Sequence, residues 1–375
     1  MEASSVGVVR MCEALARCGH DVTLFARHNG IDDESAVLAR YGVETAFRLL
    51  LLGHAGSHRE LGGHGGLDKK LRYPLAVRRA LKRLPPPDLL YGRHLYTMLV
   101  AALTLPKTPL VYEVHEVRGS RRMRWAERWL FRRRSFLGAT AVSESVIADY
   151  RQLYPDIRNL DLFLARNGAD LPCARLQAAE VGGRPGVRRC AYVGSLFPGK
   201  GMETVAALAA RLPEIDFHVV GGCGTDLADW RARTCALGNL IYHGFVDNAQ
   251  VPAYLAAMDV LLAPARPVTR LVNGRQFGMW QAPLKIFQYM AAGKPIIASD
   301  LPHVREILQH RATALLVPAE DMDAWVTALR ELEDPSLAER LKAAARAELV
   351  QRFTWTAKAQ AVTGYISQRS GLLAL

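Results

Sequence analysis

The stretch from Ala282 to Asp300, APLKIFQYMAAGKPIIASD, constrains the fold of this chain more than any other segment. Pro283 suits the first position of a helix, where a missing backbone N–H has no cost. Gly293 can adopt the left-handed conformation that ends a helix, and Pro295 blocks continuation. The next residues, PIIAS, are apolar and partly β-branched, which is typical of an inner parallel strand. This segment therefore predicts a short helix that leads into a buried parallel strand.

The start of this helix also predicts an anion site. Backbone N–H groups in the first turn of a helix have no acceptor within it, so the backbone around Pro283, Leu284 and Lys285 would form an anion pocket. In open parallel sheets, ligands bind near the carboxyl ends of the strands. We therefore expect a diphosphate at this position.

Strands and helices alternate along the chain, which predicts the α/β class with parallel sheets covered by helices on both faces. A chain of 375 residues suits two domains of about 150–200 residues each. The stretch Leu171–Arg189 is rich in Gly, Pro and Arg and reads as a linker. We predict doubly wound domains over 1–170 and 171–355, with a helix over about 356–375 that returns to the first. The strand candidates are Asp21–Arg27, Asp88–Arg93, Pro109–His115, Ala139–Ser143, Cys190–Leu196, Asp216–Gly222, Leu240–Phe245, Asp259–Ala265 and Pro295–Ser299, and Phe47–Gly53 has strand length.

The first domain lacks its expected first strand. The chain opens in a helix, VGVVRMCEALARCGH, followed by the strand DVTLFAR. A doubly wound sheet normally has a central strand and a Gly-rich turn before that helix, and only the end of such a turn, Ser5–Gly7, is recognisable. Deleting a central strand would expose the hydrogen-bonding edges of two neighbours, so we expect the natural start to lie upstream.

Several motifs in the second half occur in a specific order and spacing. They are ARNGAD from Ala165, GSLFPGKG from Gly194, HGFVDNAQVPAYLAAMDVLLAP from His243, the segment from Ala282, and FTW from Phe353. Together they resemble glycosyltransferase family 4, a retaining family with the GT-B fold. The resemblance implies two Rossmann-like domains facing across a cleft. It also implies transfer of a sugar from a nucleotide-diphosphate donor to an acceptor hydroxyl, in the synthesis of surface polysaccharide, glycolipid or a related glycan.

The resemblance assigns a diphosphate-binding role to Lys200, in a Gly-rich turn between a strand and a helix. A cation there would stabilise the leaving diphosphate, although an exposed turn lysine is the alternative. Gly194 and Gly201 frame the turn, and Ser195 stands where many members have an Arg.

Gln288 stands where members have a Glu that binds the ribose. A glutamine still accepts hydrogen bonds, but without charge assistance. Ala282 replaces a usual capping Ser, and Trp280 stands where some members have a further acid. Phe245 and the loop Gly221–Gly224 are expected to border the base.

On the acceptor side, His115 ends a strand and matches the family's cleft histidine, which orients the reaction. A histidine at a strand end is otherwise often a structural residue. Arg93 and His94 follow another strand and would line the acceptor side with Gly7, unless they are simply exposed. Asn167 and Gly168 match the family's interdomain hinge.

Two further interpretations of the site stay open. The substitutions at Ser195, Gln288 and Ala282 allow a weak or inactive enzyme that acts as a nucleotide- or membrane-binding partner. An epimerase or phosphorylase on the same architecture is the third class. We expect no metal, because no D-x-D motif follows a strand, and no cofactor besides the nucleotide-sugar substrate.

The chain carries a formal net charge of +12, and much of it lies between Arg118 and Arg134. This stretch has eight arginines and one glutamate, with Trp125 and Trp129 among them, and predicts a basic amphipathic helix. The helix could be packed by its tryptophans, touch anionic lipid headgroups or a lipid-linked acceptor, or bind nucleic acid. We expect no nucleic acid, because no recognition motif accompanies the charge.

Other features concern location. Six scattered cysteines without a C-x-x-C pair favour a reducing compartment. No apolar run approaches the roughly 20 residues that span a bilayer, and no signal peptide is visible. We therefore expect a cytoplasmic protein, with a peripheral position on the inner face of the membrane as the alternative. The Gly- and His-rich segment His54–Asp68 lacks metal-ligand spacing and is expected to be a flexible loop.

Overall fold

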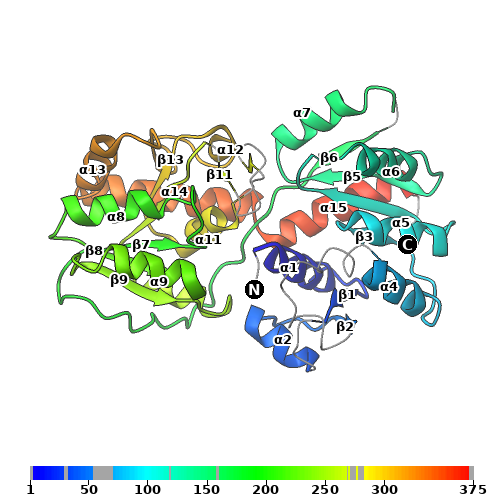
Figure 1. Cartoon of the computed structure of the whole chain (residues 1–375), viewed down its shortest axis with the longest axis horizontal. Coiled ribbons are helices and arrows are strands. Elements are labelled where there is room, and N and C mark those ends of the chain that lie inside the picture. The colour runs from blue at the N-terminus through cyan, green and yellow to red at the C-terminus, as the bar shows by residue number, and fades with distance from the viewer. Residues whose placement is uncertain are drawn as a thin grey trace. The chain divides into compact units, whose positions relative to one another are not determined.

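The structure, a computed structural model, describes residues 3–28, 33–53, 71–117, 120–157, 160–267, 269–270, 276–277 and 283–370. The chain divides into two compact units, each with helices around strands (Figure 1). The N-terminal unit comprises Gly7–Arg166 and Lys358–Leu375, and the C-terminal unit comprises Met1–Val6 and Asn167–Ala357. The chain thus leaves the N-terminal unit just before Asn167 and returns to it at Lys358.

The C-terminal unit contains a six-stranded parallel sheet. Its strands follow the order β9-β8-β7-β10-β13-β14, so the strand order reverses between β7 and β10. This is the doubly wound order in which ligands bind outside the carboxyl ends of the strands at the reversal. The strands are β7 (Arg189–Val193), β8 (Asp216–Val220), β9 (Leu240–Gly244), β10 (Val260–Ala263), β13 (Ile296–Ser299) and β14 (Leu315–Val317), and β11 (Thr269–Arg270) pairs with β12 (Gln276–Phe277).

Helices cover both faces of this sheet because side chains alternate along its strands. In β7, Cys190 and Tyr192 belong to one hydrophobic core, and Ala191 and Val193 belong to the other. The helices are α8 (Met202–Arg211), α9 (Gly224–Arg233), α10 (Val251–Ala256), α11 (Leu284–Ala292), α12 (Pro302–Arg305), α13 (Met322–Glu331) and α14 (Pro335–Arg352).

The N-terminal unit has its strands in two parallel sheets, β1-β2 and β3-β4-β5-β6. Within the described residues, β1 pairs only with β2 and β3 pairs only with β4, which is the arrangement of a doubly wound sheet without its central strand. The Tyr73 hydroxyl donates a 2.7 Å hydrogen bond to the Phe25 carbonyl of β1. The strands are β1 (Thr23–Arg27), β2 (Arg48–Leu52), β3 (Leu90–Gly92), β4 (Leu110–Val114), β5 (Phe136–Ala141) and β6 (Leu162–Leu164).

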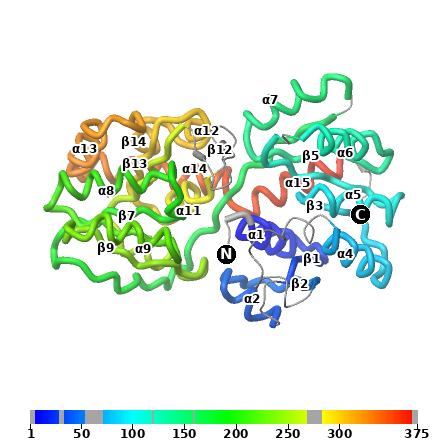
Figure 2. Tube along the Cα trace, viewed as in Figure 1, coloured from blue at the N-terminus to red at the C-terminus, as the bar shows by residue number. Residues whose placement is uncertain are grey.

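The last helix of the described part, α15 (Trp355–Ser370), packs against the N-terminal unit (Figure 2). Its Tyr365 ring stacks on Phe163 of β6, with ring centroids 4.7 Å apart. The other helices of this unit are α1 (Ala3–Arg17) from Gly7 onward, α2 (Glu34–Tyr41), α4 (Tyr73–Leu81), α5 (Leu95–Thr104), α6 (Arg121–Phe131) and α7 (Glu144–Leu153).

The structure corrects several sequence-based expectations. Ser5–Gly7 is not the end of a loop but lies within α1, because one glycine costs a helix only about 1 kcal/mol. The three-residue strands β6 and β14 were not predicted, since such short runs show no periodicity. The segment His54–Asp68 lies outside the described residues. Within the described ranges, no helix is long and apolar enough to cross a membrane.

Candidate active site

The glycine turn after β7 lies at the reversal point of the C-terminal sheet. Gly201, just before α8, has φ +99°, and a Cβ there would lie 2.1 Å from the carbonyl oxygen of Pro264. The turn therefore passes directly against the residue that follows β10, which only glycine permits. Gly194 also has a positive φ, +151°, and its N–H donates a 2.9 Å hydrogen bond to Val220 of β8.

Two tyrosines fix this region. Tyr192 in β7 donates a 2.6 Å hydrogen bond to the carbonyl of Ser195, which holds the turn in place. The hydroxyl of Tyr289 in α11 accepts from the Val193 N–H at 2.9 Å and donates to the Leu262 carbonyl at 3.2 Å. These bonds tie α11 to both strands that flank the reversal point.

The start of α11 lies one residue later than the sequence predicts. Pro283 is the N-cap, with an extended backbone, and Leu284 begins the helix. Proline has no N–H, so the donors of the predicted anion pocket are Leu284 and Lys285. Gly293 ends the helix with φ +63°, as predicted.

Two lysine side chains lie close enough here to influence each other's charge. The Lys285 Nζ lies 3.9 Å from the centroid of the Tyr192 ring and 3.0 Å from where a Cβ on Gly194 would stand. Burial, and then the nearby Lys200, lower the pKa of Lys285 to about 7. Burial also lowers the pKa of Lys200. The amines of Lys200 and Lys285, which we call the lysine pair, thus share a desolvated site at the reversal point.

A buried histidine adjoins the lysine pair. His303 in α12 is only 6% exposed, and burial together with Lys200 lowers its pKa to about 4. The imidazole is therefore neutral at pH 7. This residue was not singled out from the sequence, because its helix turn carries no motif.

The remaining predicted donor residues have different positions. Gln288 is half-buried one turn into α11, on the side of Leu284 and Lys285. Phe245 follows β9 and is 43% exposed, at the carboxyl end of the sheet, where the Gly221 N–H after β8 donates to the Gly244 carbonyl. Ala282 and Trp280 lie outside the described residues.

In the N-terminal unit, the end of β4 carries a buried ionic cluster around Glu113. The Glu113 carboxylate accepts hydrogen bonds from Tyr91, from His115 Nε2 at 2.5 Å and from Lys358 Nζ at 3.2 Å. The side chains of Glu113 and Lys358 are 9% and 3% exposed. We call Tyr91, Glu113, His115 and Lys358 the Glu113 cluster.

The protonation states within the Glu113 cluster follow from these contacts. Burial alone would raise the pKa of Glu113, but Lys358, His115 and the hydrogen bonds hold it well below its usual range. Burial lowers the pKa of His115 despite the attraction of Glu113, and Arg93 lowers it further. The imidazole is therefore neutral at pH 7, and since its Nε2–H donates to a carboxylate, Nδ1 remains a hydrogen-bond acceptor.

Of the other predicted acceptor-side residues, Arg93 lies near His115, whereas His94 and Gly7 have different surroundings. Arg93 follows β3, the neighbour of β4, and is close enough to act on His115. His94 is the N-cap residue of α5, and its Nδ1 hydrogen-bonds Thr97 Oγ1 at 2.7 Å. Gly7 lies inside α1 rather than in a loop. The structure thus brings Arg93 and His115 together, and it assigns His94 a local partner.

The predicted basic helix is α6, and its packing differs from the expectation. Trp125 is 69% exposed, while Leu130 and Phe131 are buried. The single glutamate, Glu127, is fully buried and accepts hydrogen bonds from Tyr150 at 2.9 Å and Tyr154 at 2.5 Å. Trp125 therefore does not pack the helix, and Glu127 does not offset the arginines at the surface.

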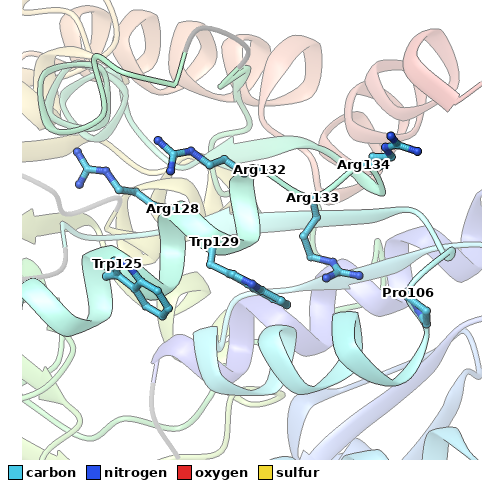
Figure 3. Close-up of a pocket in the computed structure, with 7 residues that line it drawn as sticks. All are labelled: Pro106, Trp125, Arg128, Trp129, Arg132, Arg133 and Arg134. Carbon is cyan, nitrogen blue, oxygen red and sulfur yellow. The ribbon is translucent and has the colours of Figure 1, made fainter.

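A pocket of about 490 Å³ lies on this helix. Trp125, Trp129 and Arg133 point to one side of α6 in Figure 3, while Arg128 and Arg132 point away. We call the lining residues the arginine–tryptophan surface; they are Pro106, Trp125, Arg128, Trp129, Arg132, Arg133 and Arg134.

Family models match both units. A model described as Glycosyltransferase Family 4 matches residues 4–172, and one described as Glycosyl transferases group 1 matches residues 187–334. Among curated relatives, the phosphatidyl-myo-inositol mannosyltransferase of Mycolicibacterium smegmatis is 33% identical over 42% of this chain. The match spans only 39% of that protein's length. A glycogen synthase of Mycobacterium tuberculosis is 26% identical over 97% of this chain and 91% of its own.

Solved structures share the whole fold. Sucrose-phosphate synthase from Thermosynechococcus elongatus superposes with a TM-score of 0.72 at 20% identity, over 98% of this chain and 93% of its own. HepE of Anabaena, solved in complex with UDP, superposes with a TM-score of 0.68 at 16% identity, over 98% of this chain and 96% of its own. Two family models that cover both units, together with this shared two-domain architecture, show that the chain belongs to glycosyltransferase family 4 and has the GT-B fold.

Proposed function

We propose that this protein transfers a sugar from a nucleotide-diphosphate donor to an acceptor hydroxyl, with retention of configuration. The observation that carries the proposal is the lysine pair beside the first turn of α11, at the reversal point of the C-terminal sheet. The two lysine side chains and the helix N–H groups together suit a bound diphosphate.

The same groups account for departure of the nucleotide. When the bond between sugar and diphosphate breaks, negative charge develops on the diphosphate oxygen. Cations and backbone donors already placed there stabilise that charge without reorganisation. Lysines supply this charge here, so we propose a metal-independent reaction. The diphosphate oxygen then accepts the acceptor's proton on the same face of the sugar, which gives retention.

His115 is proposed to orient the sugar and the acceptor in this reaction. Its neutral imidazole keeps Nδ1 as an acceptor for a hydroxyl, because Glu113 accepts the proton on Nε2. The nearby Arg93 adds a donor on the acceptor side.

Relatives guide the choice of substrates. HepE was solved with UDP, and the M. smegmatis relative is named for a mannosyl transfer to phosphatidyl-myo-inositol. We propose UDP-, GDP- or ADP-sugars as donors and a glycan or lipid-linked acceptor, in surface polysaccharide or glycolipid synthesis. We place the protein in the cytoplasm, peripheral to the membrane.

The test is calorimetric binding of UDP, GDP and ADP, followed by transfer and hydrolysis assays with the matching sugars. Lys200→Ala should weaken binding by about 1.5–3 kcal/mol, because a charge-assisted contact is lost. Lys342→Ala is the control, since this lysine pairs with Glu339 on α14. Equal affinities of the wild type and Lys200→Ala would remove Lys200 from the site.

A weak or inactive enzyme is the second candidate, because Ser195 and Gln288 bring no charge to the donor site. Nucleotide binding with no hydrolysis or transfer of any donor would support this candidate. Turnover with any donor would dismiss it.

We also propose that the arginine–tryptophan surface binds anionic lipid. Arg128 and Arg132 share one carboxylate, Asp156, at 2.9 and 2.8 Å. The Arg133 guanidinium lies 4.7 Å from the Trp129 ring, and its Nε is buried without a hydrogen-bond partner among the described residues. Exposed tryptophan beside uncompensated arginine is the composition that suits a headgroup region.

Co-sedimentation with phosphatidylglycerol and phosphatidylcholine vesicles tests this surface. Arg133→Gln should reduce binding to the anionic vesicles about fivefold at low salt, since each arginine near such a surface contributes about 1 kcal/mol. Arg211→Gln, in the C-terminal unit, is the control. Equal binding to neutral and anionic vesicles would reject a lipid role.

A further inference from the structure

We infer that Lys285 is a second diphosphate-binding cation, and that it takes up a proton when a nucleoside diphosphate binds. The inference rests on the proposed donor site and names a residue and a linkage within it. It starts from the position of the Lys285 amine, above the Tyr192 ring and beside Gly194, at the turn that precedes Lys200.

The groups around Lys285 do not neutralise its charge. Lys200, in the glycine turn, acts on it as a like charge. The Lys285 amine lies over the Tyr192 ring of β7, on which Tyr289 acts in turn. His303 in α12 lies near Lys200 and is neutral at pH 7. Glu203 in α8 acts on Tyr192, but no carboxylate in the described part of the chain forms an ion pair with Lys285.

An amine in this position is balanced between two protonation states. Burial and the like charge of Lys200 disfavour the ammonium, so the pKa of Lys285 is about 7 in the empty site. At pH 8 about nine in ten molecules therefore carry the neutral amine. A diphosphate placed against both lysines supplies the missing negative charge and favours the ammonium again.

Diphosphate binding and proton uptake by Lys285 should therefore favour each other. Binding raises the pKa of Lys285, so close to one proton enters the complex at pH 8 and about half of one at pH 7. The terminal phosphate of the nucleotide is already ionised at pH 8, since its second pKa is near 6. His303, with its pKa near 4, does not titrate at that pH.

The substitution that isolates the effect is Lys285→Arg. Arginine stays charged at all accessible pH values, so it can bind the diphosphate without taking up a proton. Lys285→Met keeps the length of the side chain and removes the charge. Lys342→Arg controls for changes unrelated to the site, because Lys342 pairs with Glu339 on its own helix α14.

The experiment is calorimetric titration with UDP, GDP and ADP at pH 8, in two buffers that differ in ionisation enthalpy. We expect nearly one proton taken up by the wild type and by Lys342→Arg, and less than about 0.2 by Lys285→Arg. Lys285→Met should bind at least about tenfold more weakly, because a charge-assisted contact is lost. Circular dichroism verifies that each variant is folded.

The outcomes separate this inference from the proposed function. If Lys285→Arg takes up as many protons as the wild type when the nucleotide binds, a group other than Lys285 receives the proton and the inference is overturned. If no nucleotide binds, inorganic pyrophosphate is the second probe. Pyrophosphate binding with the proton uptake would keep the inference and reject the proposed donor, whereas no binding of either would overturn both.

Discussion

Replacing Lys358 with methionine should destabilise the N-terminal unit, because it leaves the Glu113 carboxylate buried without its cation. The two side chains are 3% and 9% exposed and their charged atoms are 3.2 Å apart. Removing one partner of a buried ion pair typically costs about 3–5 kcal/mol, far more than the pair itself contributes. Tyr91 and His115 still donate to the carboxylate, so we expect the lower end, about 3 kcal/mol at pH 8.

The loss should depend on pH. Without Lys358 the cluster carries one uncompensated negative charge, which a proton on Glu113 or His115 would cancel. The cost of Lys358→Met should therefore fall as the pH is lowered, by up to about 1.4 kcal/mol per unit. In the wild type, stability itself depends on pH in the opposite direction. Glu113 has a lowered pKa, so its contribution to the free energy of unfolding is lost as the pH falls through that pKa.

The assay is amide hydrogen exchange of β4 and α15, because a chain of two units need not unfold in one step. Glu113→Gln combined with Lys358→Met removes both charges and should recover most of the loss. Arg211→Met is the matched control, since its pair with Asp323 is exposed and should contribute less than about 1 kcal/mol. A change below about 0.5 kcal/mol at pH 8, or no recovery in the double variant, would refute the reasoning.

Three further outcomes follow from the C-terminal unit. Gln288→Glu should improve donor affinity by about 1 kcal/mol, measured by calorimetry, because a carboxylate holds a ribose diol more strongly than an amide does. Weaker binding and slower turnover would mean that the pocket is built for a neutral group. Gly201→Ala should lower both the stability and the nucleotide affinity, since its Cβ would stand 2.1 Å from the Pro264 carbonyl oxygen. Gly238→Ala is the control, because a Cβ there meets no atom within 4 Å, and equal urea midpoints for the two variants would contradict the prediction. His218 and His303 have pKa values lowered to about 4, mainly by burial, so between pH 6.5 and 4 the unfolded chain binds more protons than the folded one. The free energy of unfolding should therefore decrease as the pH falls through this range, by up to about 1.4 kcal/mol per pH unit for each histidine. Urea midpoints that do not change between pH 6.5 and 4 would contradict this prediction.

Much of the C-terminal unit could be predicted because its signals are local. Strand β13 is an apolar β-branched run, and α11 ends at Gly293 in the left-handed conformation. Gly201 needs a positive φ because the turn must pass the end of β10. The strand run and the helix end depend on neighbouring residues only, so the sequence contains them in full, whereas the contact of Gly201 with Pro264 joins residues far apart in the chain.

The charge partners could not be predicted in this way. Lys358 is 245 residues from Glu113 in the chain, and no pattern in the sequence links them. Glu127 is the single glutamate of a basic stretch, and nothing in that stretch indicates that Tyr150 and Tyr154 donate to it in the core. Both pairings depend on which helices pack against which strands.

The sequence by itself determined the family, the alternating order of strands and helices, and the glycine turns, because periodicity and backbone conformation are properties of short segments. Only the tertiary structure decided the protonation states at the site. Burial and the proximity of Lys200 make Lys285 a titrating amine. Burial keeps His115 neutral despite the attraction of Glu113, which accepts a hydrogen bond from its Nε2. The physical reason is that pKa values depend on desolvation and on charges brought together through space, which the order of residues along the chain does not specify.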